Sequence, residues 1–561
     1  MSNQMFNQPL SEYPRPQLYR ESYISLNGEW EYAITSTPDF PKKYDGTIIV
    51  PFSPESKLSK VERNLKPGEY LFYRLMFSLP EDFIKDKVIL HFTAVDQIAE
   101  VYLNDEFVGE HVGGFLPFEF DIKSHLKQEN ILIVRVQDFS DSSYYSRGKQ
   151  RINHGGIWYT PQSGIYMPVW LESVNEKYVE NVKFTPDIDK QEIIINIKSK
   201  ADEAIIHIFG SDRPIACNKD NHIKVNDMHL WSPEDPYLYF VRIEIEGCDE
   251  ITSYFAMRKF SLVKDDNGLT RLGLNNKPLF MKGVLDQGYY SDGLLTPPSY
   301  EHYIKDIDLV KKLGFNTIRK HIKIEIPRWY FECDKRGIIV WQDFVNGGSN
   351  YSFSCIAIPL ITGKNKKDDD YKFFARENET GRKEALEEFK ETINYLYNCP
   401  CIGLWTIFNE GWGQFDSKKI YEELVKIDST RLYDHASGWH DQGVSDVKSL
   451  HVYFKKVKMP KTEQRAIILS EFGGLVLPIK GHIIKGNSVY RKYSSPDKLI
   501  KAYQKMIERD VIANIPKGLS ASIYTQLSDV EEETNGFVTY DREIVKVDTN
   551  IIKDINDKIS L

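Results

Sequence analysis

Two glutamates stand at the ends of apolar segments. Glu410 follows Asn409 after the apolar run that begins at Ile402, and Glu471 ends the run that begins at Ala466. Glycine follows each glutamate within two residues. A single glutamate in such a place has a plain structural explanation, which is a salt bridge to a neighbouring Arg or Lys. Two of them, both followed by glycine and one preceded by Asn, favour a pair of carboxyl groups that performs chemistry.

The distance between two such carboxyl groups decides what they do to a glycosidic bond. At about 5 Å, one carboxylate attacks the anomeric carbon while the other protonates the leaving oxygen, and the anomeric configuration is retained. A wider gap admits a water molecule and inverts the configuration. The sequence therefore predicts that Glu410 and Glu471 form a pair suited to glycoside hydrolysis.

The elements that position this pair are predicted to be the strands of a barrel. After residue 273, fully apolar segments alternate with amphipathic stretches, which is typical of βα units around a parallel sheet. We expect strands over 280–284, 315–321, 337–343, 402–409, 432–435, 449–453, 466–471 and 519–526. We expect helices over 300–313, 326–336, 383–397, 417–427 and 496–512. Eight strands fit a complete (β/α)8 TIM barrel, whose catalytic groups lie where strands end.

Glu410 and Glu471 then end the fourth and seventh strands and face each other across the barrel mouth. The long segment over 346–381 ends in a solvated charge run. Long loops at this face often cap active sites. A cap and a disordered flap are both compatible with this segment.

The part of the chain before the barrel is predicted to be rich in β-structure. From residue 25 to about 172, short alternating apolar runs are broken by turn signals such as Asn27-Gly28, which indicates an antiparallel β-sandwich. A second β segment over 175–263 has about the size of an immunoglobulin-like β-sandwich. We therefore expect three domains, over 1–174, 175–268 and 269–561.

Composition limits the classes of partner. The 561 residues are too many for one hydrophobic core, and the net charge of −9 argues against nucleic acid or an anionic membrane as a partner. The six cysteines lack the spacing of a disulfide framework, so we expect reduced thiols. No secretion signal or run of 18 apolar residues is visible, so we expect a cytoplasmic protein with a small imported substrate. The oligomeric state, including a homo-oligomer, stays open.

These motifs also carry a family resemblance that extends over nearly the whole chain. Asn409-Glu410 and Glu471-Phe472-Gly473 are similar to the acid/base and nucleophile motifs of glycoside hydrolase family 2. That family contains β-galactosidases, β-glucuronidases and β-mannosidases. Further similar motifs are Arg15-Pro16, Leu26 to Trp30, Val50 to Ser56, Gly113 to Phe118, Gly164 to Trp170, Leu230 to Pro233 and Phe255 to Lys259. The resemblance implies an N-terminal sugar-binding-like jelly roll, an immunoglobulin-like domain and a C-terminal barrel.

The resemblance also implies a role for each motif residue. Glu471 is expected to attack and form a covalent glycosyl-enzyme, while Glu410 donates a proton and then activates water. Glu410 should be protonated at rest, because the charge of Glu471 and apolar walls such as Trp405 and Trp412 raise its pKa. Asn409 is expected to contact the sugar 2-hydroxyl. Tyr453 is similar to the family tyrosine that donates to the nucleophile, with core packing as its alternative.

Further polar and aromatic residues stand at the other strand ends. We expect substrate contacts from residues after the first, second, third and fifth strands, with a structural polar network as the alternative for each: Asp286, Arg319, His321, Trp341, Asp343 and Trp439. Many related barrels end the eighth strand with a Trp under the sugar. This chain has Tyr524 there, so either Tyr524 substitutes or the floor is built differently.

The sequence departs from parts of the family's pattern in ways that bear on the sugar. We find neither the Asn-x-Lys pair with which β-glucuronidases hold a carboxylate nor the acidic and His pattern of a magnesium site. We therefore expect no metal and no cofactor. The predicted function is a retaining exo-β-glycosidase, with β-galactosides as the first choice of substrate. A β-glucuronidase, a β-mannosidase and a non-catalytic carbohydrate-binding protein are the alternatives.

Overall fold

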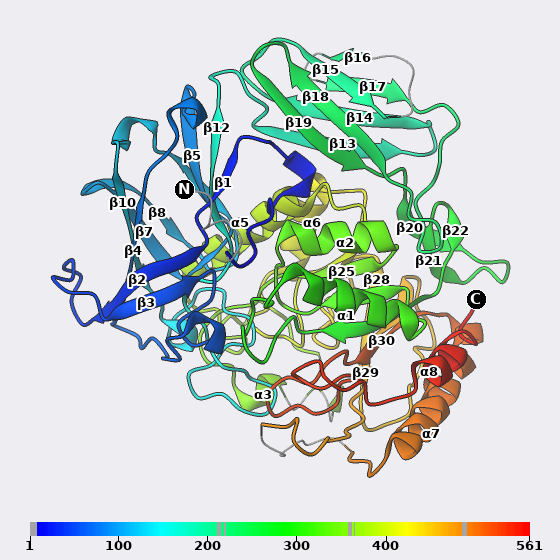
Figure 1. Ribbon diagram of the computed structural model, residues 1–561. Helices are drawn as coiled ribbons and strands as arrows, with labels where there is room; N and C mark the ends of the chain where they lie inside the picture. The colour runs from blue at the N-terminus through cyan, green and yellow to red at the C-terminus, as the bar shows by residue number, and fades with distance from the viewer. Residues whose placement is uncertain are drawn as a thin grey trace.

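Alternating apolar residues close the N-terminal part into a sandwich of two antiparallel sheets (Figure 1). We describe a computed structural model over residues 8–209, 215–217, 220–356, 359, 362–363, 365–484 and 491–561. One sheet has the order β1 (Tyr23–Ser25), β12 (Val169–Val174), β5 (Lys87–Phe92), β9 (Phe118–Asp121). The other has the order β3 (Gly46–Val50), β2 (Gly28–Thr35), β4 (Tyr70–Phe77), β10 (Asn130–Gln137), β7 (Ile98–Leu103), β8 (Glu106–Val112). Their facing apolar side chains, among them Trp30, Phe92 and Val134, form one buried core.

A short ribbon, β6 (Val95–Asp96) with β11 (Gly164–Ile165), joins the segments that leave this sandwich. The second sandwich follows directly. Its sheets have the orders β13 (Asn181–Asp187), β14 (Glu192–Lys198), β17 (Asp220–Lys224) and β16 (Ile215–Cys217), β15 (Ala204–Ile208), β18 (Tyr239–Ile245), β19 (Asp249–Phe255). Ile195, Ile206 and Val241 are buried between them, as the alternation of apolar and polar residues along these strands requires.

The third part is a parallel eight-stranded sheet, as predicted. Its order is β27 (Leu432–Asp434), β26 (Ile402–Thr406), β25 (Ile339–Asp343), β24 (Thr317–Lys320), β23 (Met281–Asp286), β30 (Leu519–Thr525), β29 (Ala466–Gly473), β28 (Val447–Val452). A small hairpin of β20 (Phe260–Lys264), β21 (Thr270–Leu274) and β22 (Lys277–Pro278) precedes it. The architecture of jelly roll, immunoglobulin-like sandwich and TIM barrel is thereby confirmed.

Helices cover the outside of the barrel, and each of the five predicted helical segments overlaps one of them. They are α1 (Tyr300–Lys312), α2 (Pro327–Arg336), α3 (Phe353–Ile356), α5 (Glu379–Leu396), α6 (Ser417–Ile427), α7 (Pro496–Met506) and α8 (Thr549–Asn556). No helix follows β27 or β28, although every residue of both connections is described. The helix expected over 496–512 is α-helical to Met506 and continues as a π turn over Ile507–Val511. Within the described chain, no helix has the length and apolarity needed to cross a bilayer.

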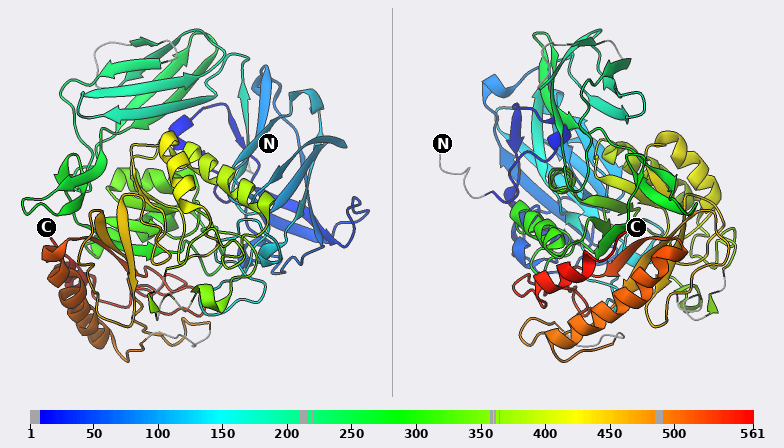
Figure 2. Two further views of the ribbon diagram at one scale, coloured as in Figure 1. Left: turned by 180° about the vertical axis from the view of Figure 1, so that it is seen from behind. Right: turned by 90° about the vertical axis from the view of Figure 1, so that its right-hand side faces the viewer.

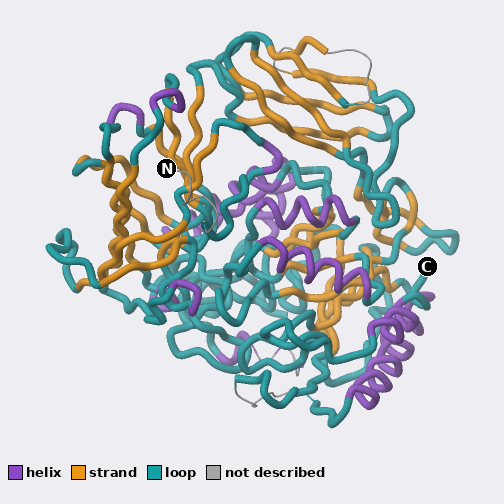
Figure 3. The backbone as a smooth tube through the Cα atoms, viewed as in Figure 1, coloured by secondary structure: helices purple, strands orange, loops and turns teal. Residues whose placement is uncertain are grey.

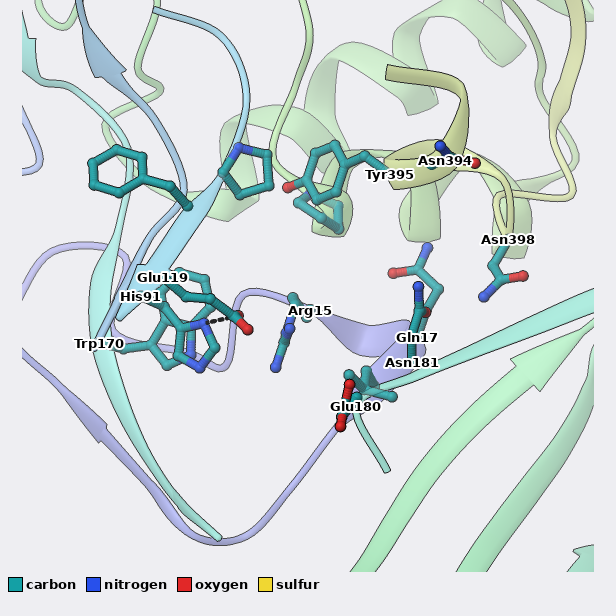
Figure 4. Close-up of a pocket in the computed structure, with 14 residues that line it drawn as sticks. Arg15, Gln17, His91, Glu119, Trp170, Glu180, Asn181, Asn394, Tyr395 and Asn398 are labelled. Carbon is teal, nitrogen blue, oxygen red and sulfur yellow. Dashed lines mark ion pairs between the residues drawn. The ribbon is translucent and has the colours of Figure 1, made fainter. Parts of the chain in front are cut away.

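The N-terminal sandwich meets the barrel along α5 (Figure 2). At this junction, Glu172 of β12 is buried between Arg15 at 2.7 Å and Arg20 at 3.4 Å. A cavity of about 270 Å³ opens beside them, with His91 and Trp170 on one side and Tyr395 of α5 on another (Figure 4). None of the carboxyl groups at the barrel mouth lines this cavity, so we interpret it as part of the domain junction.

The space between the N-terminal sheets and the barrel strands is filled mainly by loops (Figure 3). These loops include the connections that follow the barrel strands, where the predicted site residues lie. Five cysteines have described side chains, and all five are free thiols. Cys217 belongs to β16, but its side chain lies outside the described part.

Candidate active site

Glu410 is held at the end of the fourth barrel strand by its backbone. The Glu410 N–H donates to the carbonyl of Ser437 at 2.9 Å, and the Trp439 indole N–H donates to the carbonyl of Glu410 at 3.0 Å. Its φ of +51° lies in the left-handed region, which a residue with a side chain adopts at a cost of about 1–3 kcal/mol. Backbone strain of this kind persists where the surroundings fix it, and it is common at functional sites.

Glu471 lies within β29, the seventh barrel strand, as predicted. One carboxylate oxygen of Glu471 and one of Glu410 lie within 4.8 Å of each other. The two residues are 4% and 8% exposed. The structure therefore brings the two predicted carboxyl groups together in a nearly buried site, at a separation close to the roughly 5 Å of retaining glycosidases.

Arg319 connects the strand ends that carry the two carboxyl groups. Its guanidinium, which is fully buried, donates to Oε1 of Glu471 at 3.0 Å and to the side-chain oxygen of Asn409 at 2.9 Å. It also pairs with Asp343 at 3.0 Å. Arg319 is thus saturated by protein groups. These contacts orient the nucleophile candidate and the amide beside Glu410. They also leave the guanidinium of Arg319 few N–H groups with which to bind a ligand.

The arrangement leaves one donor of Asn409 free. Its side-chain oxygen accepts from Arg319, whereas its buried Nδ2 has no protein partner among the described residues. A buried donor without a partner is costly, so such a group is usually satisfied by water or by a ligand. This is consistent with the predicted contact between Asn409 and a sugar hydroxyl, which stays a prediction.

His451 links the two carboxyl groups directly. Its Nδ1 lies 2.8 Å from Oε1 of Glu410, and its Nε2 lies 3.7 Å from Oε1 of Glu471. Nε2 also lies 3.0 Å from the hydroxyl of Ser437. The sequence analysis did not propose this residue as a site residue. Its signal was a polar residue at the end of the sixth strand, two positions before Tyr453.

The surroundings keep Glu471 ionised. Burial by itself would raise its pKa, but His451, Arg319 and the hydroxyl of Tyr453, which donates to Oε2, outweigh burial and lower the pKa to about 2. A carboxylate that stays charged is the form that attacks an electrophilic carbon. The predicted contact between Tyr453 and the nucleophile candidate is therefore present in the structure.

The pKa of Glu410 is shifted in the opposite direction, upward. Burial raises its pKa, the nearby charge of Glu471 raises it further, and the hydrogen bond with His451 opposes both. Of Trp405 and Trp412, the two apolar walls predicted beside Glu410, the first lies elsewhere. Trp405 donates to Asp428 at 3.0 Å and stacks on Phe344, so it belongs to the barrel core. Two neighbouring carboxyl groups with opposite pKa shifts divide naturally into an acid and a nucleophile.

The other predicted site residues lie at different depths. His321 contacts Asp343 at 2.8 Å, and burial together with the charges of Lys149 and Arg319 holds its pKa well below the usual range, so it is neutral. Asp286, the last residue of β23, is buried and bound by the ammonium of Lys320. Trp439 holds the backbone of Glu410 and packs edge-on against His451, with ring centroids 5.6 Å apart.

Two predicted residues are not brought to the carboxyl pair. Trp341 is fully buried, and its indole N–H points to the sulfur of Met281 at 3.3 Å. Tyr524 packs against Tyr503 and Phe537 in the core. Tyr524 contacts Tyr503 of α7, so its side chain takes the helix-facing side of β30; successive residues of a strand alternate between its two faces, and the sequence motif does not reveal which face a residue takes. Tyr524 therefore does not form a floor beneath the carboxyl pair.

The N-terminal domain completes the mouth with a segment over 144–162 that we call the arm. In Figure 1 the arm is the cyan stretch beside α3. The ring centroid of Trp158 in the arm lies 5.0 Å from that of Trp412. The ring centroid of Tyr351, in the loop after β25, lies 5.9 Å from that of Trp158. The described part of the 346–381 segment thus packs at the mouth, while residues 357–358, 360–361 and 364 lie outside the described part.

The carboxyl pair with His451 also has the composition of a metal site, since one atom of each residue lies within 4.8 Å of the others. Their hydrogen bonds argue against that use. Both nitrogens of His451 already have partners, and Glu471 is bound by the cationic Arg319 and by Tyr453. A guanidinium in contact with a carboxylate disfavours a second cation on that carboxylate. The donor set therefore fits acid/base and nucleophilic chemistry better than metal binding.

Comparison with protein-family models identifies all three parts of the chain. Residues 23–173 match the sugar binding domain of glycosyl hydrolases family 2, and residues 190–258 match a second model of glycosyl hydrolases family 2. Residues 267–555, more than half of the chain, match the TIM barrel domain of glycosyl hydrolases family 2. The boundaries of these matches fall near those of the sheets described above.

Individual relatives differ in the sugar that their names specify. A β-galactosidase of Thermoanaerobacter pseudethanolicus is 24% identical over 82% of this chain, which spans 62% of that relative's length. A β-glucuronidase of Streptococcus agalactiae is 21% identical over 74% of this chain and 71% of its own length. The solved β-glucuronidase of Ruminococcus gnavus is 18% identical, with a TM-score of 0.77 over 99% of this chain and 100% of that chain. This structural likeness is evidence of the fold.

Proposed function

The chain belongs to glycosyl hydrolase family 2, and on that premise we propose that it is a retaining exo-β-glycosidase that hydrolyses terminal β-glycosides by double displacement. The observation that carries the proposal is the pair of buried carboxyl groups within 4.8 Å, one with its pKa lowered and the other with its pKa raised. If both carboxyl groups were ionised, neither could donate a proton to the leaving group.

The two groups divide the reaction between them. In the first step the Glu471 carboxylate forms a bond to the anomeric carbon while the glycosidic bond breaks, and Glu410 gives its proton to the departing oxygen. In the second step Glu410, now a carboxylate, takes a proton from water as the water oxygen displaces Glu471 from the anomeric carbon. Two inversions at one carbon give net retention.

Action at a chain end is supported by the enclosure of the pair. The arm, the loop after β25 and the loop after β26 surround carboxyl groups that are less than a tenth exposed. Enclosed carboxyl groups favour a terminal sugar, whereas cleavage within a polysaccharide requires an open cleft on both sides of the bond. The proposed substrates are therefore small β-glycosides.

A neutral glycone, with β-galactosides first, is supported by the state of the cations that the barrel itself supplies near the mouth. A uronic acid needs a cationic partner for its carboxylate. Arg319 is bound by Asp343 and Glu471, and Lys320 is bound by Asp286 and Glu325. Lys323 donates to Glu325 and to two carbonyls, while Arg491 and Lys492 are exposed.

A panel of aryl glycosides tests this proposal. We expect hydrolysis of aryl β-glycosides and none of the α-anomers, with a larger kcat/KM for a β-galactoside or another neutral β-glycoside than for the β-glucuronide. Hydrolysis of α-anomers, or of no member of the panel, contradicts the proposed function. A preference for the glucuronide that is lost on Arg491→Ala or Lys492→Ala would keep the mechanism but replace the neutral glycone.

A further inference from the structure

We infer that the ammonium of Lys149 and the carboxyl group of Glu533 bind one hydroxyl group of the terminal sugar, so that the N-terminal domain and the barrel recognise the glycone together. The inference rests on the proposed function and names a binding site within it. Lys149 belongs to the arm, and Glu533 belongs to the loop after β30, so the two residues come from different domains and are far apart in sequence.

The arm is fixed to the barrel on one side by the loop after β25. The N–H groups of Arg147 and Gly148 both donate to the carbonyl of Asn346, at 2.9 and 3.0 Å. The buried guanidinium of Arg147 donates to the carbonyls of Gly348 and Ser349. Lys149 follows these anchored residues directly, so its position relative to the barrel is determined by backbone contacts.

On its other side the arm is fixed to the loop after β30. The hydroxyl of Tyr159 donates to Glu533, and the Thr160 N–H donates to Glu531 at 2.8 Å. Within the arm, the Tyr159 N–H donates to the carbonyl of Lys149 at 3.0 Å. Lys149 and the residue that contacts Glu533 are therefore joined by one backbone hydrogen bond.

The ammonium of Lys149 lies in a nearly buried position and has no ion pair or hydrogen bond with any described residue. Lys149 is 8% exposed. Its Nζ lies 5.3 Å from the ring centroid of Tyr159 and 5.7 Å from that of Trp412. Buried lysines normally have a partner that compensates the lost hydration, and two aromatic faces supply only part of that compensation. A donor in this state is ready to bind a ligand.

The charge of Lys149 acts on the catalytic groups. Burial raises the pKa of Glu410 and of Glu533, and the charge of Lys149 opposes both rises. Burial lowers the pKa of neutral His321, and the charge of Lys149 lowers it further. Glu533 is 5% exposed, and the charges of Glu471 and Glu410 act on it in turn. Lys149 and Glu533 both adjoin Tyr159, and Lys149 also adjoins Trp412, which follows Glu410 by two residues. They form no ion pair with each other in the described structure.

A sugar hydroxyl matches the chemistry of these two groups. A hydroxyl accepts from an ammonium with its lone pairs and donates its proton to a carboxylate, so one hydroxyl satisfies both. A sugar carboxylate fits less well, because it would bring a further negative charge beside Glu533, Glu410 and Glu471. The chemical class of ligand is therefore a neutral terminal sugar with a free hydroxyl at C3, C4 or C6.

The experiment compares the best aryl β-glycoside with its 3-, 4- and 6-deoxy analogues in the wild type, Lys149→Met, Glu533→Gln and the control Lys66→Met. Lys66 is an exposed lysine of the same domain. We expect the wild type to lose about 10- to 100-fold in kcat/KM on one deoxy analogue. Lys149→Met and Glu533→Gln should each lose about as much on the parent substrate and lose nothing further on that analogue. Lys66→Met should match the wild type throughout.

Several results overturn the inference. In one, Lys149→Met hydrolyses the parent substrate as the wild type does. In another, it is weakened equally on every analogue, as a merely structural residue would be. A selective loss of β-glucuronide hydrolysis in Lys149→Met would show a carboxylate clamp in place of a hydroxyl site. If the wild type is active but the variants show no link to one deoxy analogue, the proposed function stays intact and only this inference fails. A wild type inactive on all β-glycosides contradicts the proposed function and the inference.

Discussion

Nδ1 of His451 lies 2.8 Å from Oε1 of Glu410. The ring is fully enclosed between the two carboxyl groups, and it lowers the pKa of both. It opposes the rise of the Glu410 pKa that burial and the charge of Glu471 cause. His451 is therefore expected to determine how high in pH the acid stays protonated.

Replacing His451 by Phe should move the alkaline limb of the pH profile of kcat/KM to higher pH. The acid must be protonated to act, and the variant removes a group that lowers the pKa of Glu410. The maximal rate should also fall, by about 10- to 100-fold, because the ring orients both carboxyl groups. The measurement is kcat/KM against pH on an aryl β-glycoside with a poor leaving group. An alkaline limb that stays in place or moves to lower pH contradicts this role; His222→Phe, at an exposed site, is the control.

Glu410→Gln should stabilise the folded protein at pH 8 and have little effect at pH 4. Below the ordinary pKa of 4.5, the carboxyl group is protonated in the folded and the unfolded chain alike. Above that pH the unfolded chain releases the proton first, so a raised folded pKa lowers stability as pH rises through the window between the two values. We expect a gain on the order of 1–3 kcal/mol, visible as a higher melting temperature by calorimetry. An equal change in the free energy of unfolding at both pH values would mean that folding does not raise the pKa of Glu410.

The strands of the barrel were predictable because their chemistry is local. Each of the eight predicted segments overlaps a strand, since fully apolar runs of this length are what a sheet buried on both faces requires. The pairing of Glu410 with Glu471 followed from their places at the ends of the fourth and seventh strands. The five predicted helical segments overlap α1, α2, α5, α6 and α7, and the connections after β27 and β28, where no helix was predicted, contain none.

The parts of the site that come from outside the barrel were not predictable in the same way. Lys149, Trp158 and Tyr159 belong to the arm, and their position depends on contacts with Asn346 and Glu533 in loops hundreds of residues away. Nothing in their local spacing indicates that docking. The face taken by Tyr524 was equally hidden, because the direction of a side chain follows from strand register.

Glu410→Ala should affect substrates according to their leaving group. A substrate whose leaving group needs no proton should keep its first step, while a poor leaving group should lose about 10²- to 10⁴-fold. Azide should then restore turnover by replacing the activated water and should give a β-glycosyl azide. Steady-state kinetics with two aryl leaving groups, with and without azide, make the measurement. Equal damage on both substrates and no rescue would show that Glu410 is not the acid/base.

Tyr453→Phe should lower kcat with little change in substrate affinity. Its hydroxyl donates to Glu471 and lies 3.3 Å from the hydroxyl of Thr525, so it orients the nucleophile. We expect a loss of about 10²-fold in kcat from the lost orientation. The matched control is Tyr371→Phe, because the hydroxyl of Tyr371 donates to Asp416 and not to either member of the carboxyl pair. A change confined to KM would assign Tyr453 to substrate binding instead.

The most direct test of the account is to trap the covalent intermediate on Glu471. A 2-deoxy-2-fluoro β-glycoside with an activated leaving group slows both steps and should accumulate the glycosyl-enzyme. We expect the intact mass to rise by one fluoroglycosyl group, with the label on the peptide that contains Glu471. Glu471→Gln should take no label and should lose at least about 10⁴-fold in turnover, whereas the control Glu422→Gln, at an exposed residue of α6, should behave as the wild type. A label on another residue, or an α-configured first product by NMR, would contradict the double-displacement mechanism.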